Sequence, residues 1–343
     1  MKYIQRQLFI TQLENSIMKK TFLVLATGAM LLGTSCNKSV SNEDSLPADE
    51  AVTASSQRRC SSYEVLEEEM KADPSRKQRL EAIENFTRGI VENPTMGRLL
   101  ANGDIEIPVV FNVIYKTNAQ NVSLAQLQSQ IDVLNEDFAA TNSDYGTSNP
   151  FNAAKSGDCN IRFVLESVNR KKTSKTSWST NNAMKTASQG IAATSPTTKL
   201  NIWVCNMGGG ILGYAQFPGG AAATDGVVLD DNATGRVGTA AAPFDLGRTA
   251  THEVGHWLNL RHIWGDATCG NDQVSDTPLH NTSNGGCPTA GHTSTCTGTP
   301  LEMYMNYMDY TNDACMYMFS LGQRARMQAT FAAGGPRNTF AQP

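Results

Sequence analysis

The sequence has few of the features that proteins use to bind nucleic acids or cross membranes. No long basic run follows residue 60, and 28 Lys and Arg against 32 Asp and Glu leave a net charge of -4. This balance offers no surface for a phosphate backbone, so we expect no nucleic-acid partner. No internal repeat is present, which argues against a repeat architecture. With 343 residues and 40% hydrophobic content, the chain can form one or two buried cores with terminal appendages.

The apolar run near the start is too short to span a bilayer. Met18-Lys19-Lys20 precedes the run over residues 21–32, and small residues lead to Cys36. A span needs about 20 apolar residues, so residues 1–36 indicate an export leader, with Met18 as the expected true start. We expect lipidation of Cys36, with plain secretion as the alternative. The protein is then an outer-membrane or periplasmic lipoprotein, or a secreted protein. It would associate with a membrane only through the lipid anchor.

The next segments differ in composition. Residues 37–56 are polar and acidic, which predicts a disordered tether. Asp73-Pro74, followed by apolar residues at helical spacing to about Val91, predicts an amphipathic helix. Pro94 to Gly103 break this pattern, so the main domain should begin near Arg98 to Asp104.

The main domain alternates between strand and helix patterns. Strands are predicted at 107–115, 161–166, 200–204, 214–217 and 227–229, and a helix with a Ser123 and Gln126 capping box at 124–138. The segment Tyr214, Ala215, Gln216 and Phe217 precedes Pro218-Gly219-Gly220, which is typical of an edge strand.

Histidine is scarce, yet three of the five histidines lie within residues 252–262. A helix capped by Asp245 would place His252 and His256 on one face, where both can bind one metal ion. Glu253 lies between them as the general base for a hydrolytic water molecule. His262 supplies the third ligand if the chain turns sharply before it.

Asn259 lies where that turn is needed, and asparagine tolerates the left-handed conformation. Chance clustering of ordinary histidines is the plain alternative. A structural zinc site is disfavoured because such sites normally close with a fourth protein ligand and have no use for the glutamate.

At this point the sequence resembles a family. Residues 252–262 resemble the extended zinc signature of the metzincin clan, with Asn259 in place of the usual glycine, and Asn306-Tyr307-Met308-Asp309-Tyr310 resembles its methionine-containing turn. Together with the surrounding cysteines, Trp264-Gly265-Asp266 and Asp276-Thr277-Pro278, the chain is most similar to the bacterial branch of the pappalysin metallopeptidases. The resemblance covers residue 100 to the end.

This resemblance implies an α+β metzincin-type zincin. Its features are a twisted, mostly parallel five-stranded sheet, an active-site helix, and a loop-rich, disulfide-stapled C-terminal subdomain that ends in a helix. The implied activity is that of a monomeric zinc endopeptidase, with protein or peptide substrates added to the edge strand. Tyr310 would assist the oxyanion. Met308 would lie beneath the metal, with ordinary core filling as the alternative.

The resemblance also implies the cysteine pairing Cys269–Cys296 and Cys287–Cys315, whereas the sequence alone allows three pairings of four cysteines. If the predicted strands are parallel, Cys159 and Cys205 lie at opposite ends of the sheet. We therefore expect both to be unbridged.

Relatives carry calcium in the loop 266–277, and the matching positions are Asp272, the Val274 carbonyl and Thr277. Their oxygen-rich chemistry suits calcium. The alternative is a solvated polar loop.

Two further roles follow from the resemblance. Cys60 matches a pro-segment cysteine whose thiolate closes the metal site, so residues 57–98 would be a pro-segment, cut at Arg98-Leu99, and 99–343 the catalytic domain. Asp313 would form the floor of a pocket for Arg or Lys just after the scissile bond. The alternatives are a leftover free cysteine and a solvated turn aspartate.

The competing function is an inactive zinc-binding surface lipoprotein with the same fold. The intact Glu253 and Tyr310 disfavour it, because a binding protein does not need a general base. A third reading, a zinc hydrolase with a non-peptide substrate, fits the edge strand less well.

Overall fold

The computed structural model describes residues 57–93 and 103–341. The predictions for residues 1–36 with Cys36, for the tether at 37–56 and for cleavage at Arg98-Leu99 lie outside the described residues. Within the described ranges, no helix is both long and apolar enough to cross a membrane.

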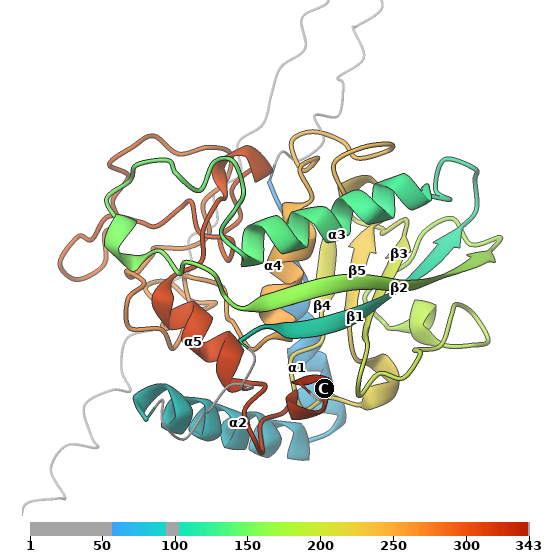
Figure 1. Cartoon of the computed structure of the whole chain (residues 1–343), viewed down its shortest axis with the longest axis horizontal. Coiled ribbons are helices and arrows are strands. Elements are labelled where there is room, and N and C mark those ends of the chain that lie inside the picture. Colours follow the sequence, from blue (N-terminus) through green and yellow to red (C-terminus); the bar gives the residue numbers. More distant parts are fainter. Residues whose placement is uncertain (1–56, 94–102, 342–343) are drawn as a thin grey trace, which may run out of the picture. The chain divides into compact units, whose positions relative to one another are not determined.

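A five-stranded sheet forms the centre of the fold, in the order β2-β1-β3-β5-β4 (Figure 1). The strands are β1 (Ile105–Tyr115), β2 (Ile161–Lys172), β3 (Leu200–Cys205), β4 (Gly213–Ala215) and β5 (Val227–Asp230). Neighbouring strands pair in parallel, except that β4 runs antiparallel to β5. The predicted mostly parallel sheet of a mixed α and β fold is therefore confirmed.

The central strands are buried because both of their faces are covered. Every residue of β3 is buried, and so is every residue of β1 from Val109 to Ile114. This burial is expected of parallel strands. The helices α3 (Leu124–Phe138) and α4 (Arg248–Trp257) pack against each other, with α3 also on β2 and α4 also on β4 and β5. A smaller apolar cluster on the sheet includes Val65 and Trp203.

Two helices precede the sheet, whereas the sequence predicted one. They are α1 (Ser62–Ala72) and α2 (Ser75–Glu92), and α2 packs against the late helix α5 (Leu321–Ala329). The helix α2 begins after Pro74, and the Asp73 side chain accepts the Ser75 N–H at 3.0 Å. The missed helix α1 has 11 residues, and Ser62, Val65 and Leu66 are its buried side chains, so few apolar positions mark it in the sequence.

The prediction of Asp245 as the cap of α4 is wrong. Gly247 occupies the N-cap position with φ +78°, a conformation that glycine adopts without strain. The Asp313 carboxylate accepts the N–H groups of Leu246 and Arg248 at 2.9 and 3.2 Å. A carboxylate from a distant loop therefore satisfies the start of this helix.

Of the two hydrogen bonds of the capping box expected at α3, only the one accepted by Ser123 forms. Ser123 Oγ accepts the Gln126 N–H at 3.1 Å, but the Gln126 amide donates instead to the carbonyls of Asp231 and Thr234. The edge strand also ends earlier than predicted: β4 contains Tyr214 and Ala215 but neither Gln216 nor Phe217.

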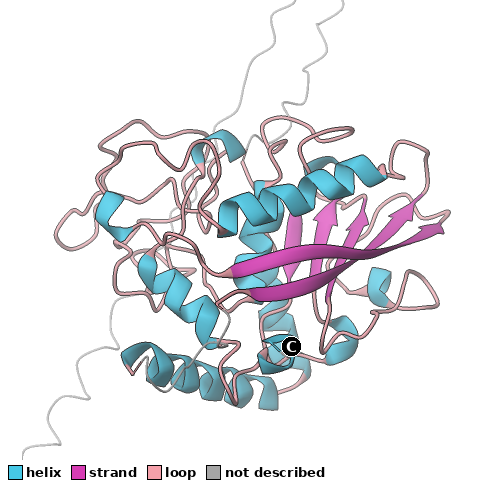
Figure 2. Cartoon of the chain, viewed as in Figure 1, coloured by secondary structure: helices cyan, strands magenta, loops and turns pink. Residues whose placement is uncertain are grey.

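The C-terminal part consists largely of loops before α5, as Figure 2 shows. Disulfides join Cys269 to Cys296 and Cys287 to Cys315, the pairing that the resemblance implies. Cys159 is buried and unbridged, as is Cys205. Short 3-10 helices occupy Asn152–Ala154, Ala183–Lys185, Ala222–Thr224, Asp231–Ala233, Asp313–Cys315 and Asn338–Ala341.

Candidate metal centre and substrate cleft

Three imidazoles converge at the end of α4. His252 and His256 lie one helical turn apart, and the helix ends at Trp257. Asn259 then adopts φ +71°, which turns the chain back so that His262 faces the helix. The Nε2 atom of His256 lies 3.1 Å from both His252 Nε2 and His262 Nε2.

The outer nitrogen of each ring is held by an oxygen. His252 Nδ1 lies 2.6 Å from the Tyr307 carbonyl, His256 Nδ1 lies 2.8 Å from the Leu260 carbonyl, and His262 Nδ1 contacts the Asp266 carboxylate. These oxygens accept hydrogen bonds, so each Nδ1 carries the proton and each Nε2 presents a lone pair.

This donor set fits a zinc ion. Burial and then the neighbouring imidazoles lower the pKa of His252, and burial likewise lowers the pKa of His256. Neutral imidazoles are the form that binds metal, and three lone pairs facing one point need a cation between them. Cys60 Sγ and the three ring nitrogens all lie within 4.8 Å of one another. Among the residues that the structure describes, this is the one such cluster of potential ligands.

Glu253 lies beside the ligands with its carboxylate out of water. Its Oε2 accepts the Ser62 hydroxyl at 2.8 Å and the Cys60 thiol at 3.4 Å. Burial raises the pKa of Glu253 to about 7, close to the value that suits a general base near neutral pH. Gly213 of β4 packs on it, and a Cβ there would come within 3.0 Å of Glu253 Cγ.

The loop between Cys296 and Cys315 places two predicted residues against the centre. Met308 lies beneath α4, where a Cβ on Gly255 would come within 2.5 Å of its sulfur. The Tyr310 ring lies 5.7 Å from the His252 ring and 4.9 Å from the His262 ring. Its hydroxyl donates to the Cys60 carbonyl at 3.0 Å.

Asp313 lies buried against Arg58 of the segment that contains Cys60. The two side chains are 0% and 1% exposed and form an ion pair. Arg58 also donates to Thr249 Oγ1 at 2.9 Å and to the Thr311 carbonyl at 3.3 Å, with its guanidinium 5.0 Å from the Phe244 ring centre. The surroundings of Asp313 therefore accommodate a planar cation with several donors.

The segment that contains Cys60 pairs with the edge strand β4 in parallel. Leu212 N–H donates to the Arg59 carbonyl at 2.9 Å, and Ser61 N–H donates to the Gly213 carbonyl at 3.2 Å. The Ser62 hydroxyl accepts the Ala215 N–H at 2.8 Å. The polar edge of β4 can thus bind an extended peptide.

The side chains of the predicted edge strand differ in their surroundings. The Tyr214 hydroxyl donates to Asn182 Oδ1 at 2.9 Å, away from the metal centre. The Gln216 amide bonds to the Ala221 carbonyl and to Thr224, so it shapes the turn after β4. The Phe217 ring lies 5.2 Å from the His256 ring.

The three expected calcium ligands lie together in the loop. Thr277 Oγ1 lies 2.8 Å from Asp272 Oδ2 and 3.0 Å from the Val274 carbonyl. Asp272 is 5% exposed, and burial raises its pKa to about 6.

Several functional contacts were not predicted from the sequence. No role was assigned to Arg58, Ser62 or Thr249, and Asp266 was noted only as a neighbour of other motifs. The position of Ser62, two residues after Cys60, is the only local signal for it.

The fold, the histidine cluster and the buried glutamate define a zinc metalloendopeptidase. The chain belongs to the family described as pregnancy-associated plasma protein-A, peptidase family M43, whose model matches residues 199–332. This confirms the resemblance to the pappalysins.

Relatives and solved structures agree with this assignment. Extracellular metalloprotease 1 of Coccidioides posadasii is 34% identical over 238 residues, which is 66% of this chain and 76% of that protein. An extracellular metalloprotease of Pyricularia oryzae is 37% identical, over 63% of this chain and 70% of that protein. A promirolysin variant of Tannerella forsythia has 42% identity and a TM-score of 0.74, covering 82% of this chain and 97% of that one. Mature mirolysin in complex with a cleaved peptide has 45% identity and a TM-score of 0.67, covering 69% and 95%.

Proposed function

We propose that the chain is exported as a latent zymogen, and that its processed form hydrolyses proteins before Arg or Lys. The observation that carries the proposal is the position of Cys60, whose sulfur lies among the three histidine nitrogens. A thiolate is a strong zinc ligand, so this side chain would fill the position that a catalytic site must leave open. Residues 57–98 are then the pro-segment and 99–343 the catalytic domain.

In the processed enzyme, His252, His256 and His262 would hold zinc. When bound, zinc polarises the scissile carbonyl and lowers the pKa of a water molecule. Glu253 would accept the proton from that water and pass it to the leaving amine. Tyr310 would donate a hydrogen bond to the scissile carbonyl oxygen, as it now does to the Cys60 carbonyl.

The pro-segment occupies each of these parts in the latent chain. Cys60 lies at the histidines, and Ser62 bonds to both the general base and the N–H of Ala215 in the edge strand. Arg58 fills the Asp313 pocket, which supports the specificity for a basic residue after the scissile bond. Met308 would support the metal site from below.

Calcium binding by Asp272, the Val274 carbonyl and Thr277 is proposed on the proximity of their oxygens. For export, the support is the leader-like sequence and the names of the two fungal relatives, which are called extracellular. Lipidation at Cys36 would be tested by the intact mass of the exported protein. A mass without acyl chains contradicts the anchor and favours plain secretion.

Latency is tested by Cys60→Ala in the full chain. We expect the uncut variant to hydrolyse peptides that contain Arg, in a chelator-sensitive way, whereas the uncut wild type does not. Ser61→Ala, which keeps the thiol, is the matched control. An uncut Cys60→Ala chain as silent as wild type would contradict the role of the thiol.

The inactive zinc-binding lipoprotein is the alternative function. The buried Glu253 beside the ligands disfavours this alternative, because a protein that only binds zinc does not need a general base there. Glu253→Ala in the processed chain should retain zinc and abolish hydrolysis.

A further inference from the structure

Arg326 of α5 is a buried cation whose acidic partner comes from α2. Its Nη2 lies 2.9 and 3.0 Å from the two carboxylate oxygens of Glu84, and the two side chains are 5% and 11% exposed. The Asn259 amide also donates to Glu84 Oε1, at 3.1 Å. Within residues 57–93 and 103–341, Glu84 is the one carboxylate that forms an ion pair with Arg326.

Contacts within the catalytic domain hold Arg326 in place without α2. Arg326 donates to the Gln273 carbonyl at 3.3 Å and to the Asn259 carbonyl at 3.2 Å, which fixes the guanidinium in place. Its Nε is buried and has no hydrogen-bond partner. Removal of α2 would therefore expose a positioned guanidinium without its acidic partner, which leaves its donors open to another carboxylate.

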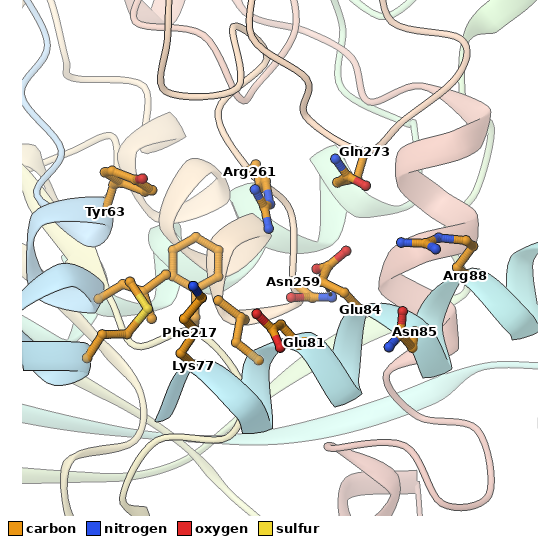
Figure 3. Close-up of a pocket in the computed structure, with 13 residues that line it drawn as sticks. Tyr63, Lys77, Glu81, Glu84, Asn85, Arg88, Phe217, Asn259, Arg261 and Gln273 are labelled. Atoms are coloured by element: carbon orange, nitrogen blue, oxygen red, sulfur yellow. Dashed lines mark hydrogen bonds between the residues drawn. The ribbon is translucent and has the colours of Figure 1, made fainter. Parts of the chain in front are cut away.

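A cavity of about 520 Å³ lies between the helices α1 and α2 and the catalytic domain. Glu84, Asn259 and Phe217 are among the residues that line it. Figure 3 shows the Glu84 carboxylate beside the Asn259 amide, with Arg261 across the cavity. The Phe217 ring also lies 5.2 Å from the His256 ring, so the cavity is next to the zinc ligands.

The path of the pro-segment indicates on which side of the metal centre Glu84 lies. Arg58 occupies the pocket for the residue after the scissile bond, and Cys60 lies at the metal ligands. The chain then continues past β4, where Arg76 donates to the carbonyls of Phe217 and Pro218 at 2.9 and 2.8 Å. Glu84 follows on α2 and lines the same cavity as Phe217.

We propose that Arg326 and Asn259 form a carboxylate-binding subsite, which takes an Asp or Glu side chain preceding the scissile bond of the substrate. Glu84 occupies this subsite in the latent chain, as Arg58 occupies the basic pocket. The inference rests on the proposed function, because it requires removal of the pro-segment. Hydrogen bonds between ions are stronger than those to neutral groups, so the subsite distinguishes Glu from its neutral isostere Gln.

The test uses the full chain after processing, with peptide pairs that share an Arg after the scissile bond. Each pair carries Glu or Gln at one position before that bond, and the position is varied along the peptide. At one or more positions, kcat/KM should be about tenfold higher for Glu than for Gln, as expected for a charge-assisted hydrogen bond. The effect should lie mainly in KM, because the subsite is remote from the reacting atoms.

Two variants remove the subsite by different routes. Arg326→Gln removes the charge, and Asn259→Gly removes the amide at a position whose φ of +71° glycine adopts readily. Arg326→Gln should bring the Glu to Gln ratio to about 1, and Asn259→Gly should lower it severalfold. Arg324→Gln on the same helix is the control, because Arg324 bonds instead to Ser156 and Asn160. It should leave the ratio unchanged.

The outcomes separate the two proposals. A processed chain that cuts both members of each pair equally overturns the subsite but leaves the peptidase intact, as does a preference that persists in Arg326→Gln. A processed chain that cuts no peptide contradicts the proposed function instead. In that case, binding of the same pairs to the Glu253→Ala chain, followed by fluorescence anisotropy, still tests the subsite: equal affinities overturn it.

Discussion

Replacement of Arg58 by Ala should release the pro-segment from the active site of the uncut chain. Arg58 and Asp313 form an ion pair with exposures of 1% and 0%, so the variant leaves a carboxylate buried without its cation. Breaking a buried pair in this way costs about 3–5 kcal/mol. The lower end applies, because the N–H groups of Leu246 and Arg248 still hold Asp313 Oδ2. The docked state should therefore lose roughly two orders of magnitude in its equilibrium.

The assay is the initial rate of hydrolysis of a fluorogenic Arg peptide by the full-length chain, with gels to show that it remains uncut. We expect a chelator-sensitive rate from Arg58→Ala and none from wild type. Arg59→Ala is the matched control, because the exposed Arg59 side chain bonds, among the described residues, only to the Gly209 carbonyl. If the uncut Arg58→Ala and Arg59→Ala chains are equally silent, the buried pair does not hold the pro-segment, and the reasoning is refuted.

Three further changes have defined outcomes. Asp313→Asn should lower kcat/KM for peptides with Arg after the scissile bond by about tenfold or more, and spare those with Leu; equal losses for both would contradict a specificity role. Arg337→Met should lower the free energy of unfolding by about 3 kcal/mol, because it leaves the buried Asp225 unpaired. In urea titrations Arg236→Met, at an exposed ion pair, should change the free energy of unfolding by less than about 1 kcal/mol. Similar losses for Arg337→Met and Arg236→Met would contradict the role of the buried pair. EGTA should lower the thermal midpoint of the chain but not of Asp272→Asn, whereas an unchanged wild-type midpoint would argue against calcium.

The parts that could be predicted from sequence are those whose signal is local. His252, Glu253 and His256 are fixed by helical spacing, and the strands that became β1, β3 and β5 are apolar runs whose burial leaves little choice of structure. The left-handed turn at Asn259 also followed from the need to bring His262 back.

The parts that could not be predicted depend on contacts between distant segments. Asp313 satisfies the start of α4 from 65 residues away, so the local candidate Asp245 was the wrong cap. Glu84 meets Arg326 across 242 residues, and neither residue lies in a motif. The helix α1 packs on α2 and on β4, and its own short sequence does not reveal these contacts.

Anomalous diffraction from crystals of the full chain, measured on both sides of the zinc absorption edge, tests the central claim most directly. The account predicts one strong difference peak bonded to the Nε2 atoms of His252, His256 and His262 and to Cys60 Sγ, at roughly 2.0–2.3 Å from each. A map without a peak at these histidines, or with the zinc bound elsewhere, would contradict it.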